Sequence, residues 1–374
     1  MIKEINIDNF KSLVGFRIKL AKFNCLIGLN GAGKSTVLQA FDFLSQLIQG
    51  DIQGWLDERH WDKSELNSKL SAKKNISFKI ITSLSDIGQL IWQGEFNRQK
   101  LSCSSEVITL DDKVLLKVVD GRLTVSEKVS TPIVFSYQGS ILSALKEKEL
   151  PYALLLFKKE LASLKSMDLL SPHLLRQRAR VSDRNLGLGG EKLSAFLYEL
   201  SQDKREQLEL YLQEYYPNFT KYQTSSLKSG WKKLAIQERY GSQQIETEAR
   251  HINDGMLRIM AIVAQILTDH SFLLFDEVED GINPELIEQL MNQLVDAPQQ
   301  ILVTTHSPMI LNYLEDSVAR EGVQLIYKNR QGISCSRAFF EIPSIAKKLE
   351  WMGPGEAFVD TELAHLVDAL NEEG

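Results

Sequence analysis

Apolar and polar residues alternate near the start of the chain: Ile5 and Ile7, and then Phe16, Ile18 and Leu20, are separated by polar positions. A period of two residues is typical of a half-buried β-strand. Residues 23–27 follow as a short apolar strand that ends at a glycine, and residues 35–48 carry apolar side chains at helical spacing. Alternating strands then fill residues 76–125, where Asp120-Gly121 is the strongest hairpin signal. The first third of the chain is therefore predicted to be mainly strands, with one amphipathic helix.

The pattern changes after one more strand, which we predict at residues 133–137. From about residue 141 to residue 216 the chain is rich in Leu, Lys and Glu and has the spacing of helices. Its apolar stripes do not persist through several uninterrupted heptads, which argues against a long coiled coil. The last third alternates strands with helices, which predicts a mainly parallel sheet covered on both faces. The expected strands of this part are residues 272–275, 301–304 and 323–327.

These patterns predict an α/β fold with a split core. Residues 1–142 would supply the first half of this core together with a β-rich lobe, and residues 251–374 would supply the second half. Residues 143–250 would form a mainly helical lid inserted between them. The two ends of the chain would then complete one mixed, mainly parallel sheet.

Composition narrows the class of protein only moderately. The 374 residues carry 43 Lys and Arg against 49 Asp and Glu, so the chain as a whole is not a cationic nucleic-acid binder, although local basic surfaces remain open. Cys25, Cys103 and Cys335 are scattered and have no metal-binding spacing, which favours a reducing, cytoplasmic setting. We expect no signal peptide and no membrane span, because no apolar run approaches the roughly 20 residues that a span needs.

A phosphate-binding pattern lies between the strand at 23–27 and the following helix. Gly28-Leu-Asn-Gly-Ala-Gly-Lys-Ser35 matches G-x-x-x-x-G-K-[ST]. Glycines allow the backbone to turn its N–H groups toward phosphate oxygens, Lys34 would reach the β- and γ-phosphates, and the Ser35 hydroxyl would bind Mg²⁺. The alternative is a chance glycine-rich turn. The predicted nucleotide-binding residues are Asn30, Gly31, Ala32, Gly33, Lys34, Ser35 and Thr36.

Two later strands end in polar residues that suit the same chemistry. Asp276 and Glu277 follow the apolar strand Phe272–Phe275; Asp276 would hold Mg²⁺, and Glu277 would act as the general base that orients the attacking water. His306 follows the next strand and would contact the γ-phosphate. The alternatives are an ordinary acidic strand end and a structural histidine.

Together with three further segments, these motifs resemble the ABC superfamily, and within it the SMC/RecF/OLD-like ATPases. The further segments are Asn253-Asp254-Gly255-Met256 at the place of the signature loop, Gln138 in Tyr-Gln-Gly-Ser at the place of the Q-loop, and Asn9-Phe10-Lys11-Ser12, which is similar to the opening of SMC-like heads. The stretch from Asp276 to Pro284 is also similar to OLD-like ATPases. The resemblance is carried by residues 1–50, 130–142 and 250–330, roughly.

The resemblance implies an ATP-sandwich homodimer that uses ATP and Mg²⁺. Asn253, Asp254 and Gly255 of one subunit would close on the nucleotide of the other, and Lys11 and Ser12 would add to the nucleotide site. Gln138 would sense Mg²⁺ and the attacking water, as both a metal and a catalytic residue. Asn253 replaces the usual signature serine, so turnover is expected to be slower. The alternatives are an ordinary turn and helix cap for the signature segment, and a solvated loop amide for Gln138.

Function beyond ATP hydrolysis stays open between two hypotheses. In the first, dimer closure acts on DNA or on a separate effector protein, a nuclease or toxin, in DNA repair or antiviral defence. Basic residues in segments 158–184 and 221–239, the second interleaved with aromatic ones, are compatible with a phosphate backbone or with a solvated helical face. In the second, ATP gates a regulatory dimerisation module with little hydrolysis. OLD-like proteins carry a Toprim domain, but about 68 residues follow His306, too few for a usual domain.

Overall fold

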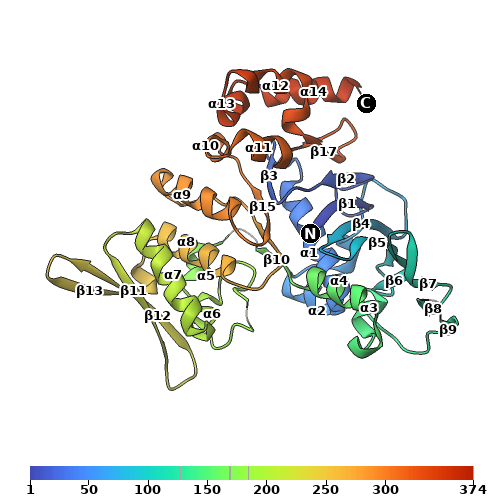
Figure 1. Cartoon of the computed structure of the whole chain (residues 1–374), viewed down its shortest axis with the longest axis horizontal. Helices are drawn as coiled ribbons and strands as arrows, with labels where there is room; N and C mark the ends of the chain where they lie inside the picture. The colour runs from blue at the N-terminus through green and yellow to red at the C-terminus, as the bar shows by residue number, and fades with distance from the viewer. Residues whose placement is uncertain (127, 168–169, 184, 374) are drawn as a thin grey trace. The chain divides into compact units, whose positions relative to one another are not determined.

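The computed structural model describes residues 1–126, 128–167, 170–183 and 185–373 (Figure 1). It divides into two compact units: Met1–Lys165 with Glu315–Gly374, and Ser166–Leu314. Within the described ranges, no helix is both long and apolar enough to cross a membrane.

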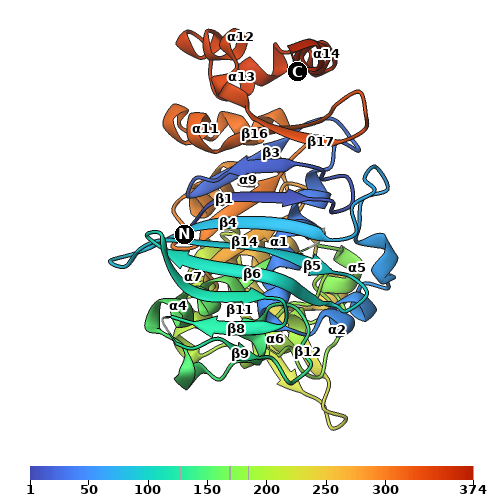
Figure 2. The same cartoon turned by 90° about the vertical axis from the view of Figure 1, so that its right-hand side faces the viewer.

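An antiparallel sheet of eight strands dominates the first unit, and several of its strands run side by side in Figure 2. Its order is β2 (Phe16–Lys19), β1 (Ile2–Asp8), β4 (Ile76–Leu84), β5 (Gly88–Asn97), β6 (Ser102–Leu110), β7 (Lys113–Val119), β8 (Arg122–Val125) and β9 (Thr131–Pro132). Burial alternates strictly along β4, which confirms the predicted period of two. Asp120 and Gly121 both have positive φ angles, of 50° and 70°, at the turn between β7 and β8. This is the backbone that a two-residue hairpin requires, so the hairpin prediction is confirmed.

The strand predicted at residues 133–137 is wrong. β9 ends at Pro132, and residues 133–138 have no regular secondary structure. Val134 and Phe135 are exposed, so their apolar character did not mark a buried strand.

The first unit also contains the strand that leads into the phosphate-binding pattern. β3 (Phe23–Ile27) is buried throughout and pairs parallel with β16 (Val323–Lys328), which pairs antiparallel with β17 (Ser334–Ala338). The helices of this unit are α1 (Lys34–Gln49), α2 (Ile52–Glu58), α3 (Ile141–Ala144), α4 (Tyr152–Ala162), α11 (Asp316–Gly322), α12 (Pro343–Ala346), α13 (Pro354–Val359) and α14 (Leu363–Glu373). Its 3₁₀ turns are η1 (Lys63–Glu65), η2 (Glu147–Glu149), η4 (Phe339–Glu341) and η5 (Lys348–Glu350).

Aromatic packing joins α1 to the eight-stranded sheet. The Phe43 ring on α1 stacks on Phe10 at 5.2 Å between centroids and meets Phe96 of β5 edge-on at 5.1 Å. All three side chains are fully buried. Such pairs add to the stabilisation from the area that they bury, so they fix the second half of α1 against the sheet.

The second unit carries the other two predicted strand tips. β14 (Phe272–Phe275) pairs parallel with β15 (Gln300–Thr304), with Phe275 opposite Val303, and all residues of both strands are buried. Long helices accompany them: α8 (Asp254–Ile266) and α9 (Pro284–Val295), with the short α10 (Pro308–Asn312) after the second strand. β10 (Leu164–Met167) crosses the boundary between the two units in sequence. The parallel pairs β3–β16 and β14–β15 confirm the α/β prediction.

The rest of the second unit is less helical than predicted. It has the helices α5 (Pro172–Leu175), α6 (Leu193–Glu199) and α7 (Gln202–Tyr215), the 3₁₀ turn η3 (Ala249–His251), and an antiparallel sheet of β11 (Phe219–Ser226), β12 (Lys232–Tyr240) and β13 (Gln243–Glu248). Ala235 in the middle strand pairs with Gln223 on one side and Glu248 on the other. β13 is largely exposed and polar, so its sequence has no apolar alternation from which a strand could be predicted. The insertion at 143–250 is therefore a mixture of helices and strands.

Candidate nucleotide-binding site

The loop between β3 and α1 is shaped by glycines in conformations that other residues avoid. Gly28, Gly31 and Gly33 have φ angles of 144°, 74° and 112°. A Cβ atom on Gly28 would lie 2.1 Å from the Ile326 carbonyl oxygen, and one on Gly33 would lie 2.3 Å from Ser334 Oγ. Glycine is therefore required at both positions by close packing as well as by φ.

The helix that follows begins with no competing cap. Gly33 is the N-cap of α1 and offers no side chain, and the first turn contains no acidic residue. The first N–H groups of a helix have no partner within the helix, which makes this end suitable for an anion. Ser35 is exposed and Thr36 is half-buried in this turn, while Asn30 and Gly31 are exposed on the loop. A loop and helix end of this kind can receive an anion such as a phosphate.

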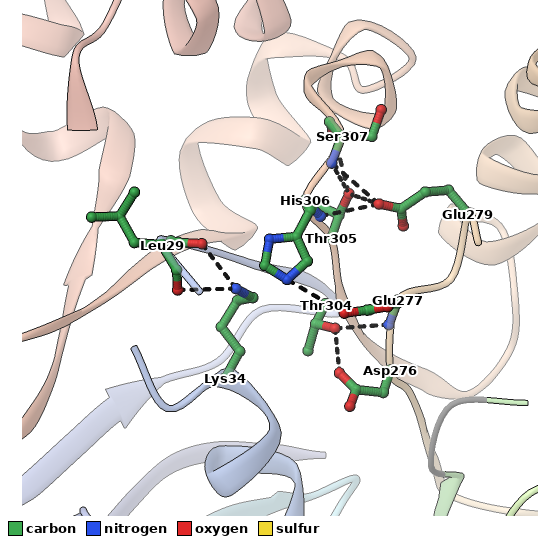
Figure 3. Close-up of polar contacts among 10 residues, drawn as sticks. Leu29, Lys34, Asp276, Glu277, Glu279, Thr304, Thr305, His306 and Ser307 are labelled. Carbon is green, nitrogen blue, oxygen red and sulfur yellow. Dashed lines mark hydrogen bonds and ion pairs between the residues drawn. The ribbon is translucent and has the colours of Figure 1, made fainter. Parts of the chain in front are cut away.

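Lys34 is folded back over its own loop, as Figure 3 shows. Its Nζ donates hydrogen bonds to the carbonyl oxygens of Gly28, at 2.8 Å, and Leu29, at 3.4 Å. The side chain is only 6% exposed. The ammonium group thus already lies at the mouth of the loop, where phosphate oxygens would compete with these neutral carbonyls for it.

Two serines from opposite ends of the chain support this loop. Ser334 Oγ donates to the Ala32 carbonyl oxygen at 2.7 Å and is 2.8 Å from Ser12 Oγ. The Ser334 N–H also donates to the Ser12 carbonyl oxygen at 2.9 Å. The structure therefore places the predicted Ser12 beside the loop. Ser334 was missed, and its neighbours in sequence contain no pattern that points to it.

Lys11 lies beside α1. Its Nζ donates to Gln39 Oε1 at 2.8 Å and stands 3.2 Å from the centroid of the Trp61 ring. Its φ of 48° is unusual for a residue with a side chain. The lysine is thus held by an amide and an aromatic face.

The structure does not bring Gln138 to the phosphate-binding loop. Its Oε1 accepts a hydrogen bond from the Gln53 N–H at 2.9 Å, at the start of α2. A Cβ on the next residue, Gly139, would lie 2.2 Å from the Leu47 carbonyl oxygen. Leu47 follows Ser35 by twelve residues of α1, which is about 18 Å of helix. The roles predicted for Gln138 at Mg²⁺ and at the attacking water are therefore not supported by this geometry.

Buried polar contacts explain why the Gln138 segment lies there. Glu106 is fully buried and accepts hydrogen bonds from Ser140 Oγ and the Ile141 N–H, both at 2.6 Å, and from Trp92 Nε1 at 3.1 Å. Burial raises the pKa of this carboxyl group, and the three donors oppose that change. These bonds anchor the start of α3 to the sheet.

The acidic pair lies in the second unit, and a threonine fixes it (Figure 3). Thr304 Oγ1 donates to Asp276 Oδ1 at 2.5 Å and accepts a hydrogen bond from the Glu277 N–H at 2.8 Å. Glu277 has a φ of 46°, and its Oε1 lies 3.4 Å from His306 Nε2. Both of these side chains are more than a third exposed. The structure therefore brings Asp276, Glu277 and His306 together, with the carboxylate of Glu277 open to solvent.

Glu279 positions the His306 loop. Its Oε1 accepts hydrogen bonds from Thr305 Oγ1 at 2.7 Å and from the N–H groups of His306 and Ser307 at 3.0 and 3.1 Å. Sequence reasoning missed this role and that of Thr304. A second carboxylate two residues after a candidate base, and hydroxyls at the neighbouring strand tip, are signals that could have suggested both.

The predicted signature loop starts α8. Asn253 Oδ1 accepts a hydrogen bond from the Met256 N–H at 2.8 Å, which makes Asn253 the N-cap of the helix. Asp254 is paired with Arg176. A Cβ on Gly255 would lie 3.0 Å from the Gly281 carbonyl oxygen, so this glycine allows close approach. The capping role that was left open is thus present in the structure.

The oxygen groups of these motifs suit Mg²⁺. The ion prefers hard oxygen ligands and is usually held by one or two protein groups together with substrate phosphates. Ser35 offers a hydroxyl and Asp276 a carboxylate that Thr304 orients. No cluster of three His, Cys, Asp or Glu residues that could hold a metal by itself is found among the described residues.

Comparison with known proteins agrees with the fold. The chain is similar to an Smc head bound to the C-terminal winged-helix domain of ScpA, with 12% identity, a TM-score of 0.57, and coverage of 90% of this chain and 96% of that one. It is also similar to the Pyrococcus furiosus Smc head with an extended coiled coil bound to the C-terminal domain of ScpA, with 12% identity, a TM-score of 0.56, and coverage of 93% and 99%. At this identity the likeness concerns the fold alone.

Sequence comparison gives a family and one short local match. An ABC transporter ATP-binding/permease protein of Mycobacterium tuberculosis is 34% identical over 83 residues, which are 21% of this chain and 9% of that protein. The chain therefore spans less than a tenth of this curated relative. A family model described as "AAA domain, putative AbiEii toxin, Type IV TA system" matches residues 23–89 and 170–312, more than half of the chain. The protein belongs to this AAA-domain family and has the fold of SMC heads.

Proposed function

We propose that this protein binds Mg-ATP at Gly28–Ser35 and hydrolyses it with Asp276, Glu277 and His306. The observation that carries the proposal is the loop before α1, where three glycines at positive φ lead into a helix whose first turn has neither a capping side chain nor an acid. An anion is the natural partner of such a helix end. The family, which is one of nucleotide-hydrolysing ATPases, supports the same conclusion.

The residues of the chain have separate tasks in this proposal. Lys34 exchanges the carbonyls of Gly28 and Leu29 for phosphate oxygens. Glu277 accepts a proton from the attacking water and orients it, and His306 donates toward the γ-phosphate. Mg²⁺, when bound, neutralises charge on the phosphates. In this scheme residues 1–142 and 251–374 form the nucleotide-binding core, and residues 143–250 form the lid.

We further propose that two copies of the chain close head to head around ATP. The signature loop at Asn253–Gly255 of one subunit would then face the nucleotide of the other. Asn253 caps α8 and Asp254 lies in its first turn, so this helix end favours the γ-phosphate through the positive end of its dipole rather than through free N–H groups. Closure of this kind converts ATP binding into a movement that a partner can detect.

The contacts of the lid favour a protein effector over DNA as the partner of this chain. Several basic residues of the lid are already neutralised: Arg178 lies 3.6 Å and Lys233 2.8 Å from Glu248, and Arg176 pairs with Asp254. Arg184, which belongs to the same basic segment, lies outside the described residues. The Smc heads above are bound to domains of a partner protein, and the family description names a "putative AbiEii toxin" of a Type IV toxin–antitoxin system; both support a protein partner. We place this partner in antiviral defence as part of the proposal. DNA remains the second candidate and predicts a salt-dependent gel shift.

Two variants test the proposal. Glu277→Gln keeps the size of the side chain and removes the base, so it should accumulate an ATP-bound dimer on sizing chromatography. Lys34→Ala should lose ATP binding in calorimetry. A monomer for Glu277→Gln at saturating ATP would contradict the sandwich dimer, and unchanged affinity for Lys34→Ala would contradict the phosphate site.

The helix cap formed by Asn253 favours an alternative function, in which ATP binding drives dimerisation with little hydrolysis. The carboxamide oxygen accepts a hydrogen bond from the Met256 N–H, which fixes the side chain in the cap, so its NH₂ group can donate to a γ-phosphate only from that position. An ATP-gated dimerisation module with little hydrolysis would fit this arrangement. It predicts ATP-dependent dimers of the wild-type protein with no phosphate release, whereas the ATPase predicts multiple turnovers.

A further inference from the structure

Arg258 is a buried charge on the helix that begins at the signature loop. Every residue of α8 from Met256 to Ile266 is buried, and Arg258 is only 4% exposed. Its Nη2 donates to Asp280 Oδ2 at 2.6 Å, while its buried Nε has no hydrogen-bond partner in the described part of the chain. A guanidinium group stays charged under all ordinary conditions. A permanent charge therefore lies on a buried, mainly apolar stretch of helix with its donors only partly satisfied.

The partner of Arg258 lies on the turn that follows the acidic pair. The Asp280 N–H donates to the Glu277 carbonyl oxygen at 3.0 Å, which closes the turn. Gly281 comes next and packs on the same helix: a Cβ on it would lie 3.3 Å from Arg258 Nε. The close approach of Gly255 to Gly281 adds a second point of attachment. The turn from Glu277 to Gly281 is thus fixed to α8 twice.

Arg258 also lines a small cavity behind the acidic pair, together with Asp276, Glu277 and Val278. Its hydrogen bond goes to Asp280, so it acts on the reacting groups only through the turn. Glu277 has a φ of 46°, a conformation that a residue with a side chain keeps only where its surroundings enforce it. The contact between Arg258 and Asp280 lies three residues beyond Glu277 on the same turn.

Stability alone does not account for this ion pair. The Arg258 side chain is 5% exposed and the Asp280 side chain 50%, so the guanidinium group loses its hydration for a partner that water still screens. Apolar residues of similar volume often stabilise a core as well or better. A methionine would fill the site of Arg258 on a helix whose neighbouring residues are apolar. Methionine, however, has no donor for Asp280, so it could not connect Asp280, and through it Glu277, to α8.

We propose that Arg258 is a positioning residue that holds Glu277 in register with the signature helix through Asp280. The inference rests on the proposed ATPase function. It means that the helix that meets the nucleotide of the other subunit is mechanically joined to the catalytic carboxylate of its own subunit. A shift of α8 on dimer closure would therefore move Glu277.

The test compares two methionine substitutions on one helix. Arg258→Met removes the ion pair, and Gln265→Met removes a buried amide that has no side-chain partner within the described residues. Arg258→Met should lower kcat for phosphate release about tenfold or more, with KM and the ATP dissociation constant within about twofold of wild type. Arg258→Lys, which keeps the charge, should recover part of the loss. Gln265→Met should match wild type.

Hydrogen exchange provides a readout that does not depend on turnover. Amides of Glu277–Gly281 should exchange faster in Arg258→Met, while those of the phosphate-binding loop should not change. A wild-type kcat with unchanged exchange would overturn the proposal. So would a loss of ATP affinity or fold shared with Gln265→Met, because that would indicate general packing. If the wild-type protein releases no phosphate, the proposed ATPase function fails, and the exchange comparison alone then decides whether Arg258 holds the turn.

Discussion

Replacing Thr304 with valine should separate the acidic pair from its support without changing the volume of the core. Thr304 is fully buried, and its hydroxyl bridges Asp276 Oδ1 at 2.5 Å and the Glu277 N–H at 2.8 Å. A hydrogen bond to a charged group contributes about 1.5–3 kcal/mol, and an N–H left unpaired costs about 1–3 kcal/mol. Since part of this can be recovered by relaxation, we expect a loss of roughly 3 kcal/mol in the free energy of unfolding.

Turnover should fall more specifically than stability. If about 2 kcal/mol of the lost interaction had served to fix the Glu277 backbone, kcat would fall about thirtyfold, while ATP affinity would stay near wild type. The assays are urea denaturation, steady-state phosphate release and titration with a fluorescent ATP analogue. Thr304→Ser keeps the hydroxyl and should lose only about 1 kcal/mol of stability, with most of the activity retained.

Thr82 provides a matched control. It too is fully buried, but its hydroxyl has no hydrogen-bond partner in the described structure. Thr82→Val should therefore leave stability unchanged or raise it, because it removes an unsatisfied polar group. Equal effects of the two valine substitutions would refute the role assigned to Thr304.

Three further predictions concern the first unit. Ser334→Ala removes the donor to the Ala32 carbonyl oxygen, and it should weaken ATP binding about tenfold in calorimetry; unchanged affinity would show that the loop holds its shape alone. Gln138→Ala should leave ATP affinity within about twofold of wild type, because the residue lies at the far end of α1; a large loss would reinstate it as a site residue. Burial raises the pKa of Glu106, so its contribution to stability is present at low pH and declines as pH rises through the folded pKa. Glu106→Gln should therefore gain stability relative to wild type as the pH rises above about 4.5 in denaturation experiments, and a stability difference that does not change with pH would contradict this.

Local patterns predicted the elements that carry the site. The strand before the phosphate-binding loop, the helix after it, and the two strand tips at Asp276 and His306 each depend on a few adjacent residues, and all of these elements are present. The hairpin at Asp120-Gly121 was predictable for the same reason, since a turn of two residues is fixed by its own φ angles.

Contacts between distant segments could not be predicted in this way. Ser334 reaches the loop from about 300 residues away, and nothing near it in sequence resembles a nucleotide-binding motif. Gln138 shows the opposite error. The motif Tyr-Gln-Gly-Ser matches a family pattern, but Glu106 and Gly139 fix this segment at the end of α1 that is remote from Ser35. A motif specifies which side chains are present in a segment, while tertiary packing decides which other residues those side chains contact.

The residues that hydrogen-bond to the candidate catalytic segments, rather than the candidate catalytic residues themselves, were the hardest part of the site to predict. Thr304, Glu279 and Arg258 contact the acidic turn or the histidine loop rather than a ligand, so a search for catalytic types of residue passes over them. Thr304 nevertheless bonds the Glu277 N–H, Glu279 bonds the His306 N–H, and Arg258 bonds Asp280 on the turn that follows Glu277. Because each supporting residue lies on a different element, the carboxylate can keep its geometry only while β15, the turn after β14 and α8 stay in register. In the proposed dimer, a site built in this way would respond to any movement of α8, and that sensitivity is what a nucleotide-driven switch requires.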